Sequence, residues 1–395
     1  MVQFVIINFL KKSKSLGSKK ILKAAKKIDY YSFLEKITPL IAVIFALLVG
    51  AIVIVIIGED PIYVYKILFS NAISNRDGWG NVLFRATPLI FTGLAVAFAF
   101  RCGLFNIGGE GQVYIGAFLS TWVGFTFTSL PAFILIPLCI LTAAAGGALW
   151  AAVPGILKAK KGVHEVIVTI MMNWIAASLT FFLVLKYKAP ETETMIAAGV
   201  KQMIPHTKEI AQAARLPRLY DLFKSINIDF PSYNQVNVSF FIAIGVAILA
   251  YYILWKTNLG YEIRAVGYNP LAAEYGGISV AKNIVLAMVI SGAFAGLVGT
   301  NEVMGFKYRW RQELFTGLGF NGIAVALLGK NHPLGVVLAA ILFGILNYGG
   351  AIVNIFTEGR IPRELIMVLQ AVIVIFVVIS DEIVKRLIVK RRKLT

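Results

Sequence analysis

Ten apolar stretches, each of about 20 residues, recur along this chain and limit its fold more than any other feature. A helix of that length is about 30 Å long, which matches the hydrocarbon core of a bilayer. The chain is 58% hydrophobic and 15% charged, whereas soluble domains carry about 25% charged residues. The pattern therefore predicts an all-α integral membrane protein. Its membrane spans are expected at residues 38–57, 82–100, 109–127, 131–156, 164–185, 238–256, 281–300, 314–329, 334–354 and 362–380.

The charged residues predict how these spans are oriented. The net charge is +18, with nine lysines in the first 36 residues and six Lys/Arg between Lys385 and Lys393. Positive charge beside a span marks its cytoplasmic end, and an even number of spans places both termini on one side. Lys158, Arg264 and Lys330 lie in loops that this orientation also places in the cytoplasm. We therefore expect both termini in the cytoplasm, and basic tails that contact anionic lipid headgroups rather than nucleic acid.

This topology divides the chain into three parts. A basic cytoplasmic extension is expected at residues 1–37, a transmembrane domain at 38–380 and a basic cytoplasmic tail at 381–395. Within the transmembrane domain, residues 186–237 form a long extracytoplasmic loop, and its prolines predict short helices joined by turns. Residues 257–280 form a cytoplasmic loop.

Patterns typical of nucleotide binding or catalysis lack their required surroundings. The segment 317–322 fits G-x-G-x-x-G but lies in a span rather than after a strand. The segment from Gly322 to Lys330 has six residues between its glycines, where a P-loop has four, and no Ser or Thr follows the lysine. The three histidines lack metal-ligand spacing, and the two cysteines lie in or beside apolar segments. We predict neither an enzyme nor a metal or cofactor bound by this chain.

Glu110 is the polar residue that most strongly indicates a function. It lies in the Gly-rich segment 105–112, at a position expected inside the bilayer, where a carboxylate costs about 2.5–3.5 kcal/mol. A similar Gly-interrupted segment recurs at 317–322. Such pairs are typical of two related halves with broken or short helices near the midplane. We interpret Glu110 as a residue of a polar pathway or its gate.

Other polar residues within the spans leave two interpretations open. Asn106 lies four residues before Glu110, so the two share a face if this segment is helical, and Thr169 and Asn173 have the same spacing. Asn321 adds an amide in the second half. Isolated amides more often hold helices together, at about 0.6 kcal/mol each, than line a pathway.

The loop 257–280 contains a helix signal between two spans. Asn269 is a helix cap before Pro270, and Gly276 and Gly277 supply the stop. A helix of under two turns is too short to anchor in lipid but suits insertion into a groove of a partner. A plain connector is the alternative.

At these residues the chain resembles the permease subunits of bacterial ABC importers for ribose, other simple sugars and nucleosides. The segment Asn269–Ile278 is similar to the coupling segment Asn-x-x-Ala-Ala-x-x-x-Gly-Ile of that family. The segments 105–112, 164–174 and 319–329 resemble its nucleoside-type members, whereas ribose-type permeases usually have an Asp-containing segment at 105–112. The resemblance covers roughly residues 60–380 and leaves the extension 1–37 unexplained.

The resemblance implies a transport mechanism and its partners. A lipid-anchored or periplasmic binding protein would deliver a nucleoside, and two permease subunits, often different homologues, would form the pathway in a bacterial cell membrane. A partner ATPase, which holds the ATP and Mg, would drive alternating access. It would dock on the loop helix through Tyr268, Asn269, Ala272, Ala273, Glu274 and Gly277. The pathway residues would be Phe105, Asn106, Glu110, Gln112, Thr169, Asn173, Trp174 and Asn321, with amides and the carboxylate for hydrogen bonds and aromatic rings for stacking.

Three alternatives remain at this point. The substrate is a ribose-like sugar, the chain is a secondary transporter driven by an ion gradient through Glu110, or it is a membrane enzyme or a structural assembly factor. The loop helix argues against the second, because a secondary transporter has no ATPase to dock. No reactive cluster supports the third.

Overall fold

The computed structural model describes residues 41, 43–74, 76–190, 205–227, 231–362 and 364–392, and describes 74, 76, 77, 312, 378 and 380–392 by their backbone alone. The predicted extension 1–37 lies outside the described residues, as do 191–204 and 228–230 of the long loop. The predicted tail 381–395 is described only to residue 392.

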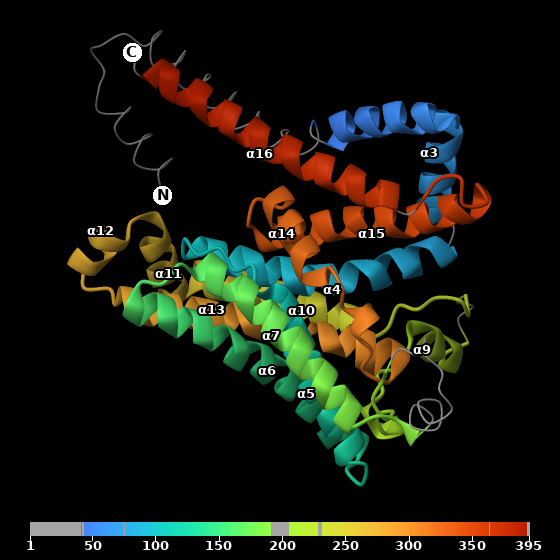
Figure 1. Cartoon of the computed structure of the whole chain (residues 1–395), viewed down its shortest axis with the longest axis horizontal. Coiled ribbons are helices and arrows are strands. Elements are labelled where there is room, and N and C mark those ends of the chain that lie inside the picture. The colour runs from blue at the N-terminus through green and yellow to red at the C-terminus, as the bar shows by residue number, and fades with distance from the viewer. Residues whose placement is uncertain are drawn as a thin grey trace. The chain divides into compact units, whose positions relative to one another are not determined.

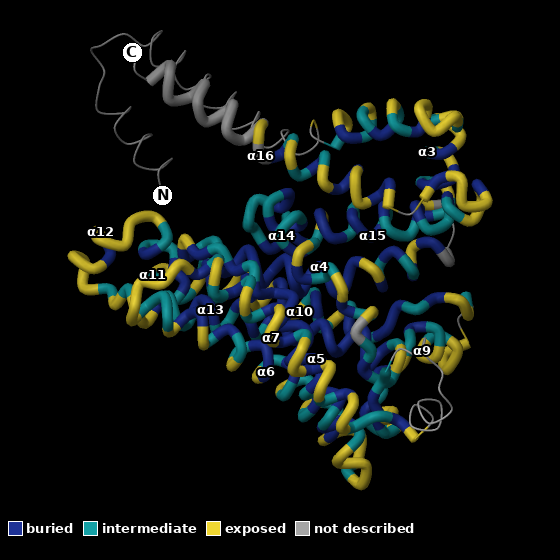
Figure 2. The backbone as a smooth tube through the Cα atoms, viewed as in Figure 1, coloured by how far each residue is buried: buried dark blue, intermediate teal, exposed yellow. Residues whose placement is uncertain are grey.

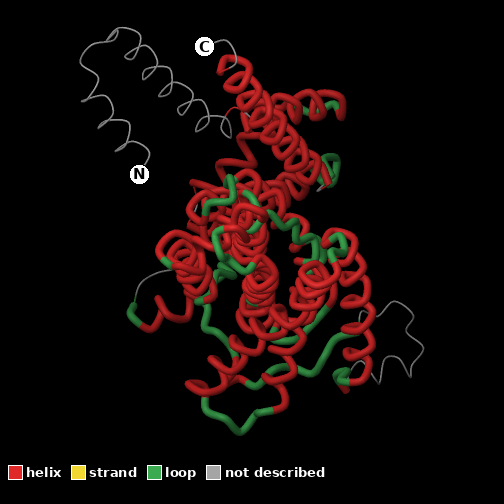
Figure 3. Tube along the Cα trace, turned by 90° about the vertical axis from the view of Figure 1, so that its left-hand side faces the viewer, coloured by secondary structure: helices red, strands yellow, loops and turns green. Residues whose placement is uncertain are grey.

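The described chain is helical, with three isolated β-bridges as its extended pairs (Figure 3). After a helix at Val43–Ile57, the labelled elements follow in order (Figure 1). They are α3 (Pro61–Phe69), η1 (Ser70–Ser74), α4 (Arg76–Arg101), α5 (Gly109–Thr126), α6 (Ala132–Lys161), α7 (Glu165–Lys186), η2 (Gln212–Ala214), α9 (Leu219–Ser225), α10 (Ser239–Lys256), α11 (Asn258–Tyr268), α12 (Pro270–Tyr275), α13 (Val280–Gly296), η3 (Thr300–Lys307), η4 (Gln312–Leu314), α14 (Leu318–Leu328), α15 (Pro333–Phe356) and α16 (Glu364–Arg392).

Among the described residues, six helices are long and apolar enough to cross a membrane. They are Gly78–Arg101, Ala132–Lys161, Glu165–Lys186, Ser239–Lys256, Val280–Lys307 and Pro333–Phe356. Shorter apolar helices lie at Val43–Ile57, Leu318–Leu328 and Glu364–Val377. The chain is therefore an all-helical, multi-pass membrane protein, as predicted.

The described residues fall into two compact units, one within residues 50–371 and a smaller one that holds 41, 43–49 and 372–392. In the smaller unit, the rings of Phe45 and Phe376 lie with centroids 4.3 Å apart. The larger unit holds the transmembrane core.

Helix α4 lies at the centre of that core. In its most apolar stretch 89% is buried, whereas the corresponding share is 28% in α6 and in α7 (Figure 2). A helix that is apolar on all sides is stable only when protein or lipid surrounds it, and α4 packs against α10, α13, α14 and α15. Its threonines need no outside partner, because Thr87 and Thr92 donate to the carbonyls of Leu83 and Pro88 four residues back.

Small residues bring α6 and α13 into close contact. A Cβ added at Gly147 would overlap the backbone of Gly292, and one added at Gly292 or Gly296 would overlap the backbone of α6. In a membrane, such close packing replaces the hydrophobic effect that joins helices in water. These two helices form the most extensive helix pair of the core.

The structure corrects several predicted boundaries. The span predicted at 314–329 begins at Leu318, because Gly317 adopts a left-handed conformation with φ of +81°. The span predicted at 281–300 continues as the π-helix η3 to Lys307. Helix α11 was not predicted, whereas the short helix after Asn269 is confirmed as α12. The short helices predicted in the long loop are confirmed for its described part by η2 and α9.

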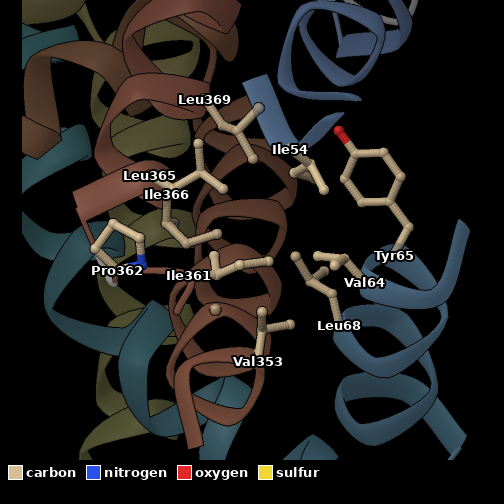
Figure 4. A pocket seen from close by; sticks show the side chains of 11 residues that line it. Ile54, Val64, Tyr65, Leu68, Val353, Ile361, Pro362, Leu365, Ile366 and Leu369 are labelled. Atoms are coloured by element: carbon tan, nitrogen blue, oxygen red, sulfur yellow. The ribbon is translucent and has the colours of Figure 1, made fainter. Parts of the chain in front are cut away.

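An apolar cavity of about 10 Å³ lies between α3, α15 and residues 361–369 (Figure 4). Ile54, Val64 and Leu68 face Val353 and Ile366 across it. A single water needs about this volume and polar partners as well. The cavity is thus a packing defect and too small for a substrate.

Candidate functional site

Two helices begin beside each other inside the transmembrane core. After α4 the chain runs without helix through residues 102–108 before α5 begins. Helix α14 begins after Gly317, and a Cβ added at Gly109 would lie only 3.5 Å from the Cα of Gly319. A Cβ added at Gly319 would overlap the backbone of Glu110. The first turns of α5 and α14 therefore meet, and each brings free N–H groups and a partial positive charge.

The Glu110 carboxylate lies between these two helix starts. Its Oε1 accepts hydrogen bonds from the Gly317 N–H at 2.6 Å and the Tyr114 hydroxyl at 3.3 Å, and its Oε2 accepts the Gly319 N–H at 2.8 Å. The residue is 5% exposed. An anion at a helix N-terminus is held by the N–H groups and by the helix dipole. These contacts account for the burial of Glu110, and its role in a pathway stays a prediction.

Asn106 and Gln112 form a reciprocal amide pair beside Glu110. Each side-chain amide donates to the other at 3.1 Å. Asn106 also donates to the Ser291 hydroxyl at 2.8 Å and accepts the Gly108 N–H at 3.0 Å. Asn106 precedes α5, so the segment is not helical at residue 106 and the condition for a helix face shared with Glu110 is not met. The fold nevertheless places both buried groups at one helix start.

Asn173 of α7 completes the start of α5. Its Oδ1 accepts the Gly111 N–H at 2.8 Å, and its Nδ2 donates to the carbonyl of Ile107 at 3.0 Å. Thr169, one turn earlier, donates to its own helix at the Val166 carbonyl at 3.0 Å. Asn173 thereby satisfies one of the N–H groups that a helix start leaves free.

Like Thr169, the other three predicted pathway residues lie outside this hydrogen-bonded network. Phe105 is half-buried, with its ring centroid 5.0 Å from that of Phe100. Asn321 is half-buried one turn into α14. Trp174 is 71% exposed and lies on a face of α7 with other exposed apolar residues.

Sequence reasoning missed several members of the site. Tyr114 lies one turn after Glu110 on α5, a spacing that points to contact. Ser291 donates to the Ala95 carbonyl at 2.6 Å and thereby links α13 and α4 to the network. Its hydrogen bond with Asn106 joins residues that are 185 positions apart in the sequence, and no local sequence pattern predicts such a contact.

A second buried carboxylate, Glu302, lies in the π-helix η3 and was not predicted as a site residue. It is 6% exposed and accepts a hydrogen bond from Asn301 at 3.0 Å. The Asn301 Oδ1 in turn accepts from Ser239 at 2.8 Å and from Asn237 at 3.3 Å. These contacts join η3 to the start of α10.

Helix α12 lies at the edge of the larger unit and is largely exposed (Figures 1 and 2). Asn269 caps it by accepting the Ala272 N–H at 3.1 Å. Tyr268, Leu271 and Tyr275 are 86%, 78% and 97% exposed. Of the predicted coupling residues, Ala273 is buried, and the others are exposed: Tyr268, Asn269, Ala272, Glu274 and Gly277. Sequence reasoning missed Leu271 and Tyr275, the two most prominent apolar side chains on this helix.

A groove of about 520 Å³ lies beside α12. It is lined by Glu274 and Gly277 at the end of α12, by Val280 and Ile284 of α13, and by Ala159 of α6. The exposed helix and this groove form one surface. We call the surface of α12 and this groove the docking surface.

The described part of the chain contains no group of three His, Cys, Asp or Glu residues that could hold a metal ion. The candidate site is a neutral amide network around one carboxylate, which can exchange hydrogen bonds with a polar, uncharged ligand.

Comparison with known proteins points to one family. The family described as "Branched-chain amino acid transport system / permease component" matches residues 78–378. The guanosine ABC transporter permease protein NupP of Bacillus subtilis is 41% identical over 347 residues, covering 87% of this chain and 93% of the relative. The nucleoside ABC transporter permease protein NupB of Lactococcus lactis is 36% identical, covering 87% and 91%. The glucose ABC transporter permease protein TsgB13 of Haloferax volcanii is 35% identical, covering 87% of each. No solved structure matches the chain.

Proposed function

This chain belongs to the family of permease components of the branched-chain amino acid transport system, and we propose that it forms part of the translocation pathway of an ABC importer for nucleosides. It is a multi-pass membrane permease and not an enzyme. The observation that carries the substrate class is the 41% identity over 87% of the chain to a permease named for guanosine. Because the chain belongs to this family, an ion-gradient-driven transporter and a membrane enzyme are no longer alternatives for its function.

The proposed topology has ten spans in two related halves, with both termini in the cytoplasm. It combines the six long helices with Val43–Ile57, α5, α14 and α16. In this proposed topology, the helical spans are interrupted before α5 and before α14, near the midplane of the membrane. In this topology α12 lies in the cytoplasm and the loop that contains α9 lies outside, with the extension 1–37 and the tail 381–395 on the cytoplasmic side.

The site around Glu110 supports a polar, uncharged substrate. Nucleosides carry hydroxyl groups and base edges that match amide donors and acceptors. The pathway residues proposed are those predicted from the sequence, with Tyr114 added because its hydroxyl contacts the same carboxylate. Glucose remains the second candidate substrate, because a glucose permease protein is 35% identical over the same share of the chain.

Transport by such a permease requires partners. ABC permeases work with an ATPase and a binding protein. We propose that the ATPase, which carries the ATP and Mg, docks on the docking surface through Leu271 and Tyr275. A second, homologous permease subunit completes the pathway, and an extracytoplasmic lipoprotein delivers the substrate.

Uptake measurements test the substrate class. Cells lacking this chain, and the same cells complemented with it, are given radiolabelled guanosine, other nucleosides, ribose and glucose. We expect complementation to restore nucleoside uptake, and the uptake to persist with a proton uncoupler while ATP is maintained. If only sugar uptake were restored, sugars rather than nucleosides would be the substrate class. If uptake were lost with the proton gradient at constant ATP, the ABC mechanism would be overturned.

The docking surface has its own test. The double substitution Leu271→Ser and Tyr275→Ser removes two side chains that are 78% and 97% exposed, so the fold should persist. We expect loss of ATPase co-purification and of uptake at an unchanged melting temperature. The matched control is Tyr233→Ser, which removes a 78% exposed ring in the loop after α9. Equal co-purification of all three proteins would contradict the assignment.

A further inference from the structure

A small basic pocket lies at the ends of α4 and α11, and the proposed transport mechanism uses neither of its two arginines. Its cavity is about 100 Å³ and is lined by Phe100, Arg101, Arg264, Gly267 and Tyr268. A water occupies about 10–15 Å³ on this measure. The pocket therefore has room for several waters or for one phosphate group.

The two arginines of this pocket both contact the indole ring of Trp255. The guanidinium carbons of Arg101 and Arg264 are 5.1 Å and 5.9 Å from the centroid of Trp255. The Nε and one terminal nitrogen of Arg101 donate to the carbonyls of Asn331 and Lys330, at 2.9 Å and 3.3 Å. The Nε of Arg264 donates to the Gly260 carbonyl at 3.2 Å. These contacts fix both groups and leave terminal N–H donors of both arginines unused within the described chain.

No carboxylate in the described part of the chain forms an ion pair with either arginine. The two like charges also repel each other. Holding two guanidinium groups close together without an anion raises the free energy of the protein. A ligand with negative charge and several acceptor oxygens removes that cost, and Arg matches phosphate oxygens with its planar fork.

The position of the pocket along the chain places it at a membrane boundary. Arg101 ends the span Gly78–Arg101, Trp255 lies one residue before the end of Ser239–Lys256, and the Lys330–His332 turn precedes Pro333–Phe356. Headgroup phosphates lie at this depth. Basic pockets between membrane helices on the cytoplasmic side bind the headgroups of anionic lipids.

We propose that this pocket binds a phosphate-bearing anion through Arg101 and Arg264, with an anionic phospholipid of the cytoplasmic leaflet as the resident ligand. The cytoplasmic location rests on the proposed topology, whereas the phosphate chemistry rests on the pocket alone. Trp255 holds the two guanidinium groups at fixed positions by contact with its ring faces or edge. Bound lipid would join the end of α4 to the end of α11.

Native mass spectrometry of the purified transporter, titrated with dimyristoyl phosphatidylglycerol or dimyristoyl phosphatidylcholine, tests the proposal. We expect one tight phosphatidylglycerol equivalent and at least tenfold weaker phosphatidylcholine binding. Arg264→Gln should weaken phosphatidylglycerol binding at least tenfold, and Arg264→Lys should weaken it less. Lys282→Gln is the matched control, because it removes an exposed positive charge at the start of α13 that does not line the pocket.

Arg264→Gln keeps the test independent of folding, since Arg101 also supports the Lys330–Asn331 turn and its loss can unfold that region. Displacement of the lipid by millimolar inorganic phosphate would support phosphate binding by the pocket and would identify a free anion, rather than a lipid, as its ligand. Equal phosphatidylglycerol binding by Arg264→Gln and Lys282→Gln would overturn the proposal. Loss of ATPase co-purification in Arg264→Gln at unchanged lipid binding would overturn it too, in favour of a protein contact.

Discussion

Replacing Glu110 by Gln keeps the size of the side chain and removes its charge. In the native site, the Gly317 and Gly319 N–H groups each donate to a separate carboxylate oxygen, at 2.6 Å and 2.8 Å. A Gln side chain has one acceptor oxygen, so its amide N–H must face one of these donors. A hydrogen bond to a charged group contributes about 1.5–3 kcal/mol, and an anion at a helix start about 0.3–1 kcal/mol. We therefore expect Glu110→Gln to lower the free energy of unfolding by about 2–4 kcal/mol.

Two measurements on the same variant separate stability from transport. The melting temperature of the purified transporter in detergent reports the first, and nucleoside uptake per folded transporter in the membrane reports the second. Tyr114→Phe is the comparison for stability alone, because it keeps the carboxylate and removes a hydroxyl that donates to it at 3.3 Å, and it should cost about 0.5–1.5 kcal/mol. A Glu110→Gln protein that melts with the wild type would refute the assignment of Glu110 to the start of α14. A protein that is destabilised but transports at the full rate per folded molecule would refute its pathway role.

Three further predictions follow from contacts around the core and the long loop. Asn173→Ala leaves the buried Gly111 N–H without its acceptor and should lower the melting temperature, with about 1–3 kcal/mol lost from the free energy of unfolding; an unchanged melting temperature contradicts this. Gly319→Ala places a Cβ against the backbone of α5, so we expect a cost of about 1–3 kcal/mol and reduced yield of folded protein in the membrane, with normal yield as the contrary result. In the long loop, hydrogen bonding by Arg309 holds the pKa of Glu209 below its ordinary value, so the pair stabilises the protein above about pH 4.3 and this contribution is lost as the pH falls through the lowered pKa. Because the Glu209 side chain is 45% exposed, this ion pair contributes about 1 kcal/mol or less to the free energy of unfolding. The melting-temperature difference between wild type and Glu209→Gln should therefore shrink on acidification from pH 7 to pH 3.

The positions of the long helices could be predicted from the sequence because a bilayer imposes a minimum apolar length. The predicted span 238–256 differs by one residue at its start from α10, Ser239–Lys256. Local chemistry also sufficed for α12, because the Asn269 cap and the Gly277 stop are both encoded within ten residues. The continuation of α13 into η3 could not be predicted, because it depends on buried contacts of Asn301 with Asn237 and Ser239 from a distant helix.

The candidate site could be predicted only in part. Residue type and burial cost led to Glu110, Asn106, Gln112 and Asn173, and all four are buried in one region of hydrogen bonds around the start of α5. The same reasoning included Trp174, which is 71% exposed. An aromatic ring in a span is compatible with a pathway, with lipid and with another subunit, and helix rotation, which decides between them, is set by tertiary packing.

The contacts of Glu110 also limit how the proposed pathway can move. The first N–H groups of α14 are satisfied by a side chain of α5, and the Gly111 N–H of α5 is satisfied by Asn173 of α7. Separating these helices within the membrane would leave buried donors without acceptors, at about 1–3 kcal/mol for each. Alternating access that separated them would therefore carry a penalty of several such groups in every cycle. We infer that α5, α7 and the start of α14 move as one body, and that the rearrangement takes place at surfaces that this hydrogen-bond network does not cross.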